Sequence, residues 1–144
     1  MDDRDKTILA CLERNARLTY AQIATEAGIS PSAVHDRVRK MEKAGIIKGY
    51  KARLDYDKAG FPITAFVSLA LSPSSPPNIP QLIAEFDLVE SCYSIAGDNS
   101  YAAVIRAPST RDLEELVDAL RGKLEVTTRT TITLSIPFEG RPIV

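Results

Sequence analysis

Leu18–Gly45 reads LTYAQIATEAGISPSAVHDRVRKMEKAG, which predicts two short amphipathic helices joined by a tight turn. In the first helix Ile23, Ala24 and Ala27 form a narrow apolar stripe. Gly28 follows at the point where a helix C-terminus favours a left-handed residue, a conformation that glycine adopts without steric cost. The small side chain of Ala24 also allows the two helices to approach closely.

The second helix carries its own start signal and one apolar face. Ser30 is a good N-cap, and Pro31 suits the first turn, where a backbone N–H would be unpaired in any case. Val34, Val38 and Met41 recur at i, i+4 and i+7, which commits this face to a core. Two such helices joined by a glycine turn are typical of a helix-turn-helix.

The opposite face of the second helix is polar and mostly basic: Ser32, Asp36, Arg39, Lys40 and Lys43. An ordinary helical hairpin with a solvated charged face would show the same pattern within this window. From Arg37 to Lys58, however, eight basic residues stand against three acidic ones. This excess of cations beside the second helix favours a surface for phosphates, and hence DNA binding.

The flanking segments complete a DNA-binding domain. Asp5–Asn15 has apolar residues at helical spacing, acids early and Arg14 late, as the helix dipole prefers. We expect it to pack as a first helix across the other two, with Thr19 capping the second. Ile46–Asp57 contains β-formers, Gly49 and further cations, and is predicted to form a strand or wing.

Charge is distributed unevenly between the two halves of the chain, although the whole is nearly neutral at −1. Residues 1–60 hold 12 Lys or Arg and 9 Asp or Glu, whereas residues 61–144 hold 6 and 10. We therefore expect a DNA-binding domain over 1–60 and a domain with another role over 61–144. No apolar run approaches the roughly 20 residues that a membrane span needs, and the N-terminus lacks a signal-peptide pattern, so a cytoplasmic protein is expected.

Cysteine and histidine usage argues against metal, disulfide and nucleophilic chemistry. Cys11 and Cys92 form neither a disulfide framework nor a metal set, and both are predicted to be small packing residues. His35 is the single histidine, and no Ser/His/Asp, Cys/His or metal-ligand cluster is present. No cofactor, metal or catalytic residue is expected.

The second half alternates strand and helix signals. Strands are predicted over 63–71, 89–96, 101–107 and 126–136, a loop over 72–80, a short helix over 81–86, and a helix over 110–120 capped by Ser109. Residues 97–100, Gly-Asp-Asn-Ser, have the composition of a hairpin turn. The order βαββαβ predicts an α+β, ferredoxin-like domain in which both helices cover one face of an antiparallel sheet.

The last predicted strand has two different faces. Val126, Ile132, Leu134 and Ile136 are expected to point toward the helices, whereas the alternate residues, Thr127, Arg129, Thr131, Thr133 and Ser135, form a polar face. The second face of the sheet would be poorly covered by so short a chain. We therefore expect a second copy to pair with it as a homodimer.

A winged-type helix-turn-helix followed by βαββαβ resembles the Lrp/AsnC, or feast/famine, regulators over essentially the whole chain. The segments that carry the resemblance are Asp5–Leu18, Ser32–Gly45, Val89–Tyr101 and Thr128–Thr131. The resemblance implies a transcriptional regulator of amino-acid or related metabolism. It implies homodimers that often assemble to octamers and that bind and bend promoter DNA. A small effector, usually an amino acid, would bind between the effector domains.

The resemblance also implies the effector site. Gly97–Tyr101 corresponds to the family's effector loop, with Gly97, Asp98, Asn99, Ser100 and Tyr101 in this sequence. Ser100 stands where a second acid is common, and a hydroxyl is a weaker partner for an α-ammonium than a carboxylate. Thr131 and Thr133 are placed at the same pocket. The alternative to an effector site is that Gly-Asp-Asn-Ser serves only as a turn between two strands.

The geometry of a helix-turn-helix assigns roles on the DNA side. Residues near the N-terminus of the second helix lie closest to the base edges, which makes Ser32, Asp36 and Arg39 the candidate base readers. Asp36 could instead form an i, i+4 ion pair with Lys40. Phosphate contacts are assigned to Arg37, Lys40, Lys43 and Lys51, and His35 to a phosphate contact or simple exposure.

Two other classes of function stay open on the sequence. Some relatives with this architecture are enzymes that decarboxylate haem precursors and use histidines in the pocket. The single histidine of this chain, His35, lies in its DNA-binding half instead. The second is an architectural DNA-binding protein without an effector. The modest net charge of the first 60 residues argues against tight non-specific coating of DNA.

Overall fold

The computed structural model describes residues 1–143, which form two units. The first comprises residues 1–53 together with 137–143, and the second comprises residues 54–136. The chain therefore passes between the units twice, once before residue 54 and once after residue 136. Each unit has its own buried cluster of apolar side chains.

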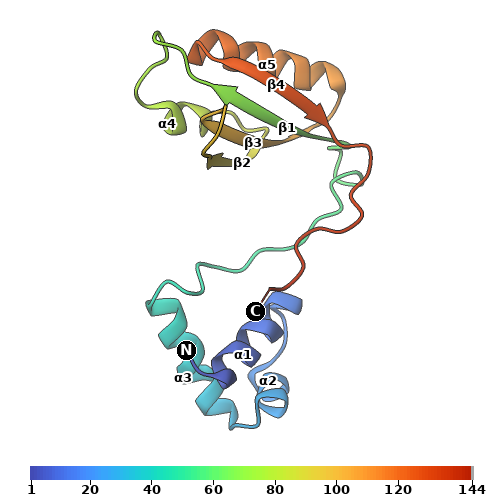
Figure 1. The fold of residues 1–144 in the computed structure, drawn as a ribbon. Helices are drawn as coiled ribbons and strands as arrows, with labels where there is room; N and C mark the ends of the chain where they lie inside the picture. The colour runs from blue at the N-terminus through green and yellow to red at the C-terminus, as the bar shows by residue number, and fades with distance from the viewer. Residues whose placement is uncertain (144) are drawn as a thin grey trace. The chain divides into compact units, whose positions relative to one another are not determined.

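The first unit contains three helices, α1 (Asp3–Arg14), α2 (Tyr20–Ala27) and α3 (Pro31–Lys43) (Figure 1). Their apolar stripes meet in one core, which confirms the helix-turn-helix and its predicted core face. Its buried members are Ile8, Cys11, Ile23, Ala24, Val34, Val38 and Met41.

The ends of these helices follow the local capping signals. Thr19 forms a capping box with Gln22 at the start of α2, and Gly28 ends this helix with φ 64°. The Ser30 side chain accepts a hydrogen bond from the Ala33 backbone N–H at the start of α3. Helix α1 begins two residues earlier than predicted, because Asp2 is its N-cap and forms a capping box with Asp5.

A second set of contacts ties α3 to the beginning of α1. One guanidinium nitrogen of Arg37 donates to Asp2 at 2.8 Å and to Asp5 at 2.7 Å. The pKa of Asp2 lies below its usual value because it accepts the Asp5 backbone N–H and, next, a hydrogen bond from Arg37. The pKa of Asp5 is lowered by the Asp2 backbone N–H and then by Arg37. The N-cap of α1 is thus also its link to α3.

The predicted strand or wing over Ile46–Asp57 is wrong for the described chain. Residues 46–54 contain no strand, and turns occupy residues 56–60. A strand needs a partner strand for its backbone hydrogen bonds, and the described part of the first unit contains only helices and loops. The N–H groups of Ile46 and Ile47 instead donate to the Met41 carbonyl at the end of α3.

The second unit is a four-stranded antiparallel sheet with two helices. Its elements are β1 (Ile63–Ala70), α4 (Ile79–Ile83), β2 (Val89–Ser94), β3 (Tyr101–Ala107), α5 (Thr110–Leu124) and β4 (Thr127–Ile132). The strand order is β2-β3-β1-β4, with every neighbouring pair antiparallel. This confirms the ferredoxin-like βαββαβ arrangement.

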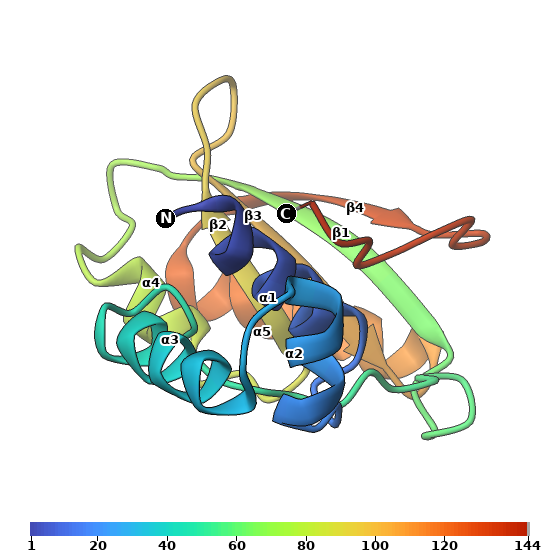
Figure 2. The same ribbon diagram turned by 90° about the horizontal axis from the view of Figure 1, so that it is seen from below.

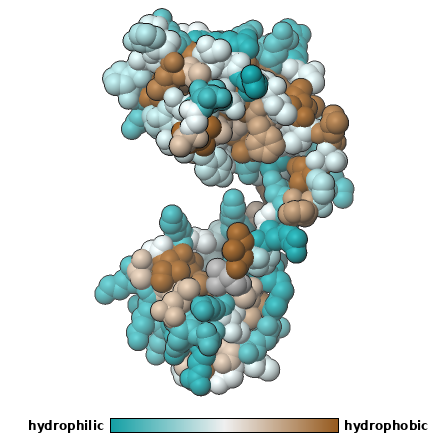
Figure 3. All heavy atoms as spheres, viewed as in Figure 1, coloured by the Kyte–Doolittle hydropathy of each residue, from teal (hydrophilic) through white to brown (hydrophobic). Residues whose placement is uncertain are grey.

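The two faces of this sheet differ in cover. Ala65, Val67 and Leu69 of β1 are buried with residues of α4 and α5, so both helices pack on one face. The alternate residues point away from the helices, and Phe66 on β1 and Tyr93 on β2 are 49% and 58% exposed. Apolar side chains consequently interrupt the polar surface of the unit (Figure 3). The sheet therefore has an uncovered face.

Several predicted boundaries in the second unit need correction. Helix α4 lies over 79–83 rather than 81–86, β2 ends at Ser94, and α5 continues to Leu124, after which Glu125 takes a left-handed conformation with φ 50°. Cys92 is exposed rather than packed, because it lies on the edge strand β2.

The largest correction concerns the last strand. β4 ends at Ile132, which is 43% exposed, and Leu134 and Ile136 are also exposed, instead of packing against the helices as predicted. β1 begins at Ile63, and Ile132 pairs with Ala65. The strand therefore ends two residues short of the start of β1, and only Thr133 continues the contact, through the Thr64 carbonyl.

Substitutions of Ser30 test how much its N-cap hydrogen bond stabilises the start of α3. Replacing Ser30 by Ala should cost about 1 kcal/mol, since the Ala33 N–H loses its acceptor, and lower the unfolding midpoint by roughly 4–8 °C. Ser30→Gly is the matched control, which should cost only a few tenths of a kcal/mol. Circular dichroism melts would show this order, and equal losses in the two variants would contradict it.

The Arg37 link predicts acid sensitivity of the helical unit. Because folding lowers the pKa of Asp2 and Asp5, their stabilisation is present above about pH 3.8 and is lost as pH falls through the lower folded values. Arg37→Gln should lower the urea midpoint at pH 6 and approach wild type once the pH falls below the lowered pKa values of both carboxyls. Arg17→Gln removes an equal charge elsewhere in the unit and should leave the pH profile unchanged. A constant offset between wild type and Arg37→Gln at every pH would refute this account.

Candidate nucleic-acid interface and effector loop

The outward face of α3 presents cations that the protein does not neutralise. Arg39, Lys40 and Lys43 are all exposed. Within residues 1–143 none of their side chains takes part in a hydrogen bond or an ion pair. This differs from Arg14 and Arg37 of the same unit, whose guanidinium groups bind Glu26 and Asp2/Asp5. One face of α3 therefore presents three cations without a partner among the described residues, and Arg4, Arg17, Lys48 and Lys51 of the same unit also have none there.

The N-terminal half of the same face is polar. Ser32 is exposed, and its hydroxyl lies 3.1 Å from that of Ser30. The His35 Nδ1 lies 3.5 Å from a carboxylate oxygen of Asp36, so the structure pairs Asp36 with His35 rather than with Lys40. His35 also meets the Tyr20 ring edge to face, with 5.5 Å between ring centroids. The side chains at this end of α3 therefore present both donors and acceptors.

Arg37 lies outside this set. Its side chain is held by Asp2 and Asp5, which leaves its guanidinium engaged within the protein instead of free for a phosphate. The sequence signal was incomplete, because the partners lie 35 and 32 residues away. We therefore give Arg37 a role in positioning α3 against α1. Lys51 is exposed in the segment that follows α3, and its side chain has no partner within the described residues.

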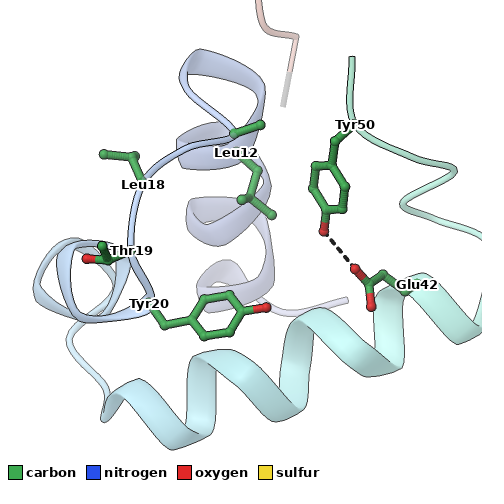
Figure 4. Close-up of a pocket in the computed structure, with 7 residues that line it drawn as sticks. Leu12, Leu18, Thr19, Tyr20, Glu42 and Tyr50 are labelled. Atoms are coloured by element: carbon green, nitrogen blue, oxygen red, sulfur yellow. Dashed lines mark hydrogen bonds between the residues drawn. The ribbon is translucent and has the colours of Figure 1, made fainter. Parts of the chain in front are cut away.

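A cavity that the sequence did not predict lies beside α3 within the helical unit (Figure 4). It measures about 360 Å³ and is lined by Leu12, Ala16, Leu18, Thr19, Tyr20, Glu42 and Tyr50. The Tyr50 hydroxyl donates to Glu42 at 2.8 Å, and burial together with this carboxylate raises the pKa of Tyr50 to about 12. The contact attaches the segment after α3 to the helix.

The candidate effector loop forms the turn between β2 and β3. Ser94 pairs with Tyr101, the Ile95 N–H donates to the Ser100 carbonyl at 3.0 Å, and the Ser100 N–H donates to the Leu69 carbonyl at 2.9 Å. Gly97 has φ 137°, which favours glycine. The turn projects away from the sheet (Figure 2).

The side chains of this turn are open to solvent. Gly97, Asp98 and Asn99 are exposed, and Ser100 and Tyr101 are partly buried. Within residues 1–143 the Asp98 carboxylate has no hydrogen bond or ion pair. It is therefore available as an acceptor for an ammonium group.

The two threonines assigned to the same pocket lie farther along the sheet. Thr131 is opposite Phe66, three residues along β1 from Leu69, or about 10 Å. Thr133 bonds to Thr64, five residues from Leu69, or about 17 Å, and both its N–H and its hydroxyl donate to the Thr64 carbonyl. One chain does not bring Thr133 together with the loop.

Two features are absent from the described residues. No group of three or more His, Cys, Asp or Glu side chains that could hold a metal ion was found among residues 1–143. No helix within this range is long and apolar enough to cross a membrane.

Both halves of the chain match known protein domains. Residues 1–48 match the model of a winged helix-turn-helix DNA-binding domain, and residues 64–143 match the Lrp/AsnC ligand binding domain. The regulator LrpA of Mycobacterium tuberculosis is 39% identical over 98% of this chain and 95% of its own length. The regulatory protein AsnC of Haemophilus influenzae is 32% identical over 96% and 94%.

Solved structures agree with these relatives. A feast or famine regulatory protein from M. tuberculosis complexed with L-methionine superimposes with a TM-score of 0.93 at 39% identity, covering 98% of this chain and 97% of its own. AsnC of Escherichia coli gives 0.82 at 30% identity, covering 96% and 95%. Both relatives are named as regulators, which supports the regulator interpretation over the decarboxylase alternative. With a DNA-binding and a ligand-binding domain in this order, the chain belongs to the Lrp/AsnC family of transcriptional regulators.

Proposed function

We propose that the protein is a cytoplasmic, sequence-specific regulator of promoters for amino-acid or related metabolism, and that a small effector controls it. The observation that carries the DNA half is the outward face of α3, where Arg39, Lys40 and Lys43 have no intramolecular partner among the described residues. A helix with this face docked in the major groove places cations where phosphates and base edges lie.

The proposed contacts divide into two classes. Ser32, Asp36 and Arg39 read base edges, with Arg39 able to donate bidentately to guanine and Asp36 able to accept from a cytosine amine. Lys40, Lys43 and Lys51 contact phosphates, which strengthens binding to every sequence alike. His35 lies at the margin, against Tyr20, and is assigned a phosphate contact.

Dimerisation follows from the uncovered face of the sheet. Phe66 and Tyr93 are about half exposed on this face, and a second copy would remove them from water. Two-fold symmetry then predicts a pseudo-palindromic site whose half-sites lie about one helical turn apart or a multiple of it. By analogy with the family, dimers assemble to octamers and bend the DNA.

The effector proposal rests on the Gly97–Tyr101 loop. Asp98 is an exposed carboxylate without an intramolecular partner, which suits the α-ammonium of an amino acid. Asn99, Ser100 and Tyr101 offer neutral hydrogen bonds beside it. Thr131 lies on the uncovered face of the sheet, where a second chain can bring it to an effector bound between domains, and Thr133 is not included. A relative bound to L-methionine supports an amino acid as the ligand class.

A second candidate function is an architectural DNA-binding protein without an effector. The exposed position of the loop favours it, because Gly97, Asp98 and Asn99 do not line a closed pocket in the single chain. The effector screen below separates the two.

Replacing Arg39 and Lys43 of α3 by Ala tests which side chains read bases and which contact phosphates. Arg39→Ala should cost about 1–3 kcal/mol and relax the preference at one base position, because a base contact is lost. Lys43→Ala should weaken all sequences alike and reduce the salt slope by about 1. Binding titrations on selected and scrambled duplexes measure both, with Arg111→Ala on α5 as a charge-matched control. If Arg39→Ala leaves affinity and preference unchanged, the groove assignment fails.

Thermal shift against the twenty amino acids, L-methionine included, tests the effector. A ligand at a hundred times its dissociation constant stabilises by about 2.7 kcal/mol, which raises the midpoint by several degrees. Asp98→Asn should remove the shift because the ammonium loses its charged partner, whereas Asp87→Asn, an equal change at another exposed position, should keep it. If none of the twenty amino acids raises the midpoint, the architectural alternative is supported.

A further inference from the structure

A buried cation lies on the otherwise uncovered face of the sheet. Arg106 on β3 is 6% exposed, and its Nε donates to Glu90 of β2 at 2.8 Å. Its Nη1 donates to the hydroxyl of Thr64 on β1 at 2.7 Å. Burying a guanidinium is costly unless charge and hydrogen bonds compensate it, so these partners indicate a site built for this side chain.

The cover over Arg106 comes from the segment that precedes the sheet. The guanidinium carbon lies 4.3 Å from the centroid of the Tyr56 ring, and the Tyr56 hydroxyl donates to Glu90 at 3.4 Å. Tyr56 belongs to a compact turn in which the Phe61 N–H donates to the Tyr56 carbonyl at 2.8 Å. The Asp55 carbonyl accepts the Ala59 N–H in the same turn. The connection that enters the second unit is therefore attached to the sheet through a cation–π contact.

The other connection is attached at the same corner. The Thr64 carbonyl accepts both the N–H and the hydroxyl of Thr133, the residue that follows β4, at 2.9 and 2.8 Å. Thr64 thus binds Arg106 with its side chain and Thr133 with its backbone. Figure 1 shows both connections leaving the end of the sheet where β1 begins and β4 ends.

We propose that this corner cluster (Tyr56, Thr64, Glu90, Arg106 and Thr133) fixes the direction in which both connections leave the sheet. In doing so it sets the half-site spacing that the protein accepts on DNA. The inference rests on the proposed function, because it needs two helix-turn-helix units on one DNA site. The residues position these units and touch neither base nor phosphate.

The physical reason is effective concentration. When both connections leave the sheet in one direction, the second DNA-binding unit of a dimer is held near one position, and its local concentration is high at the matching half-site only. When the corner cluster is broken, the second unit samples many positions. Affinity for the correct spacing then falls, and affinity for wrong spacings rises relative to it.

Tyr56→Leu is the main variant, because it removes the cation–π contact and the hydroxyl but retains apolar bulk over Arg106. The probe is a duplex that the wild-type protein selects from a random pool, together with the same duplex carrying 5 extra base pairs between half-sites, about half a helical turn. Wild type should bind the lengthened duplex much more weakly. In Tyr56→Leu the ratio of the two dissociation constants should fall roughly tenfold, while affinity for a single half-site stays within about twofold.

Matched controls separate this role from a general loss of stability. Lys58→Ala removes an exposed ion pair with Asp55 from the same turn and should keep the wild-type ratio. Thr133→Val removes only the hydroxyl donor at the other connection and should lower the ratio in the same direction. If Tyr56→Leu does not fold, Glu90→Gln and Thr133→Val decide the question.

The outcomes are distinct. A wild-type ratio in Tyr56→Leu, Glu90→Gln and Thr133→Val overturns the corner cluster as a spacing device and leaves the proposed regulator intact. An equal loss on the selected duplex, the lengthened duplex and the single half-site likewise overturns it. Failure of the wild-type protein to select any duplex overturns the proposed function, and this inference with it.

Discussion

Burial of Val34, Val38 and Met41 against α1 and α2 is the constraint on which the DNA-binding half depends. In a helix of 3.6 residues per turn, burying one stripe determines which side chains face away from it. Arg39, Lys40 and Lys43 are exposed for this reason, and the Arg37 link to Asp2 and Asp5 holds the same helix against α1. The candidate DNA-binding face is therefore the side of α3 opposite the core.

The arginines fall into two groups according to what surrounds them. Arg14, Arg37 and Arg106 bind carboxylates of their own unit, and in each case the pair joins elements far apart in the chain. Arg39 has no such partner in the part of the chain described. An ion already paired within the protein gains little from a phosphate, whereas an unpaired, hydrated one releases counterions when it binds DNA. Intramolecular pairing thus marks Arg14, Arg37 and Arg106 as structural cations.

The sheet unit places the two proposed sites at opposite ends of β1. The Gly97–Tyr101 loop lies beside Leu69, whereas the corner cluster that holds both connections lies at Thr64. β3 runs between them, since Tyr101 pairs with Leu69 and Arg106 with Thr64. The uncovered face between the two ends is where a second copy is proposed to bind.

The sequence alone determined the features that depend on neighbours within about four residues. These are the helices and their apolar stripes, the Thr19 and Ser30 caps and the left-handed Gly28, because capping and helical hydrogen bonds close over that distance. Tertiary structure decided what depends on distant partners. The 46–54 segment has no strand to pair with, β4 ends opposite Ala65 of β1, and Arg37 and Arg106 bind carboxylates on other elements. A local pattern carries the propensity to be a strand or a phosphate ligand, but only the fold supplies or withholds the partner.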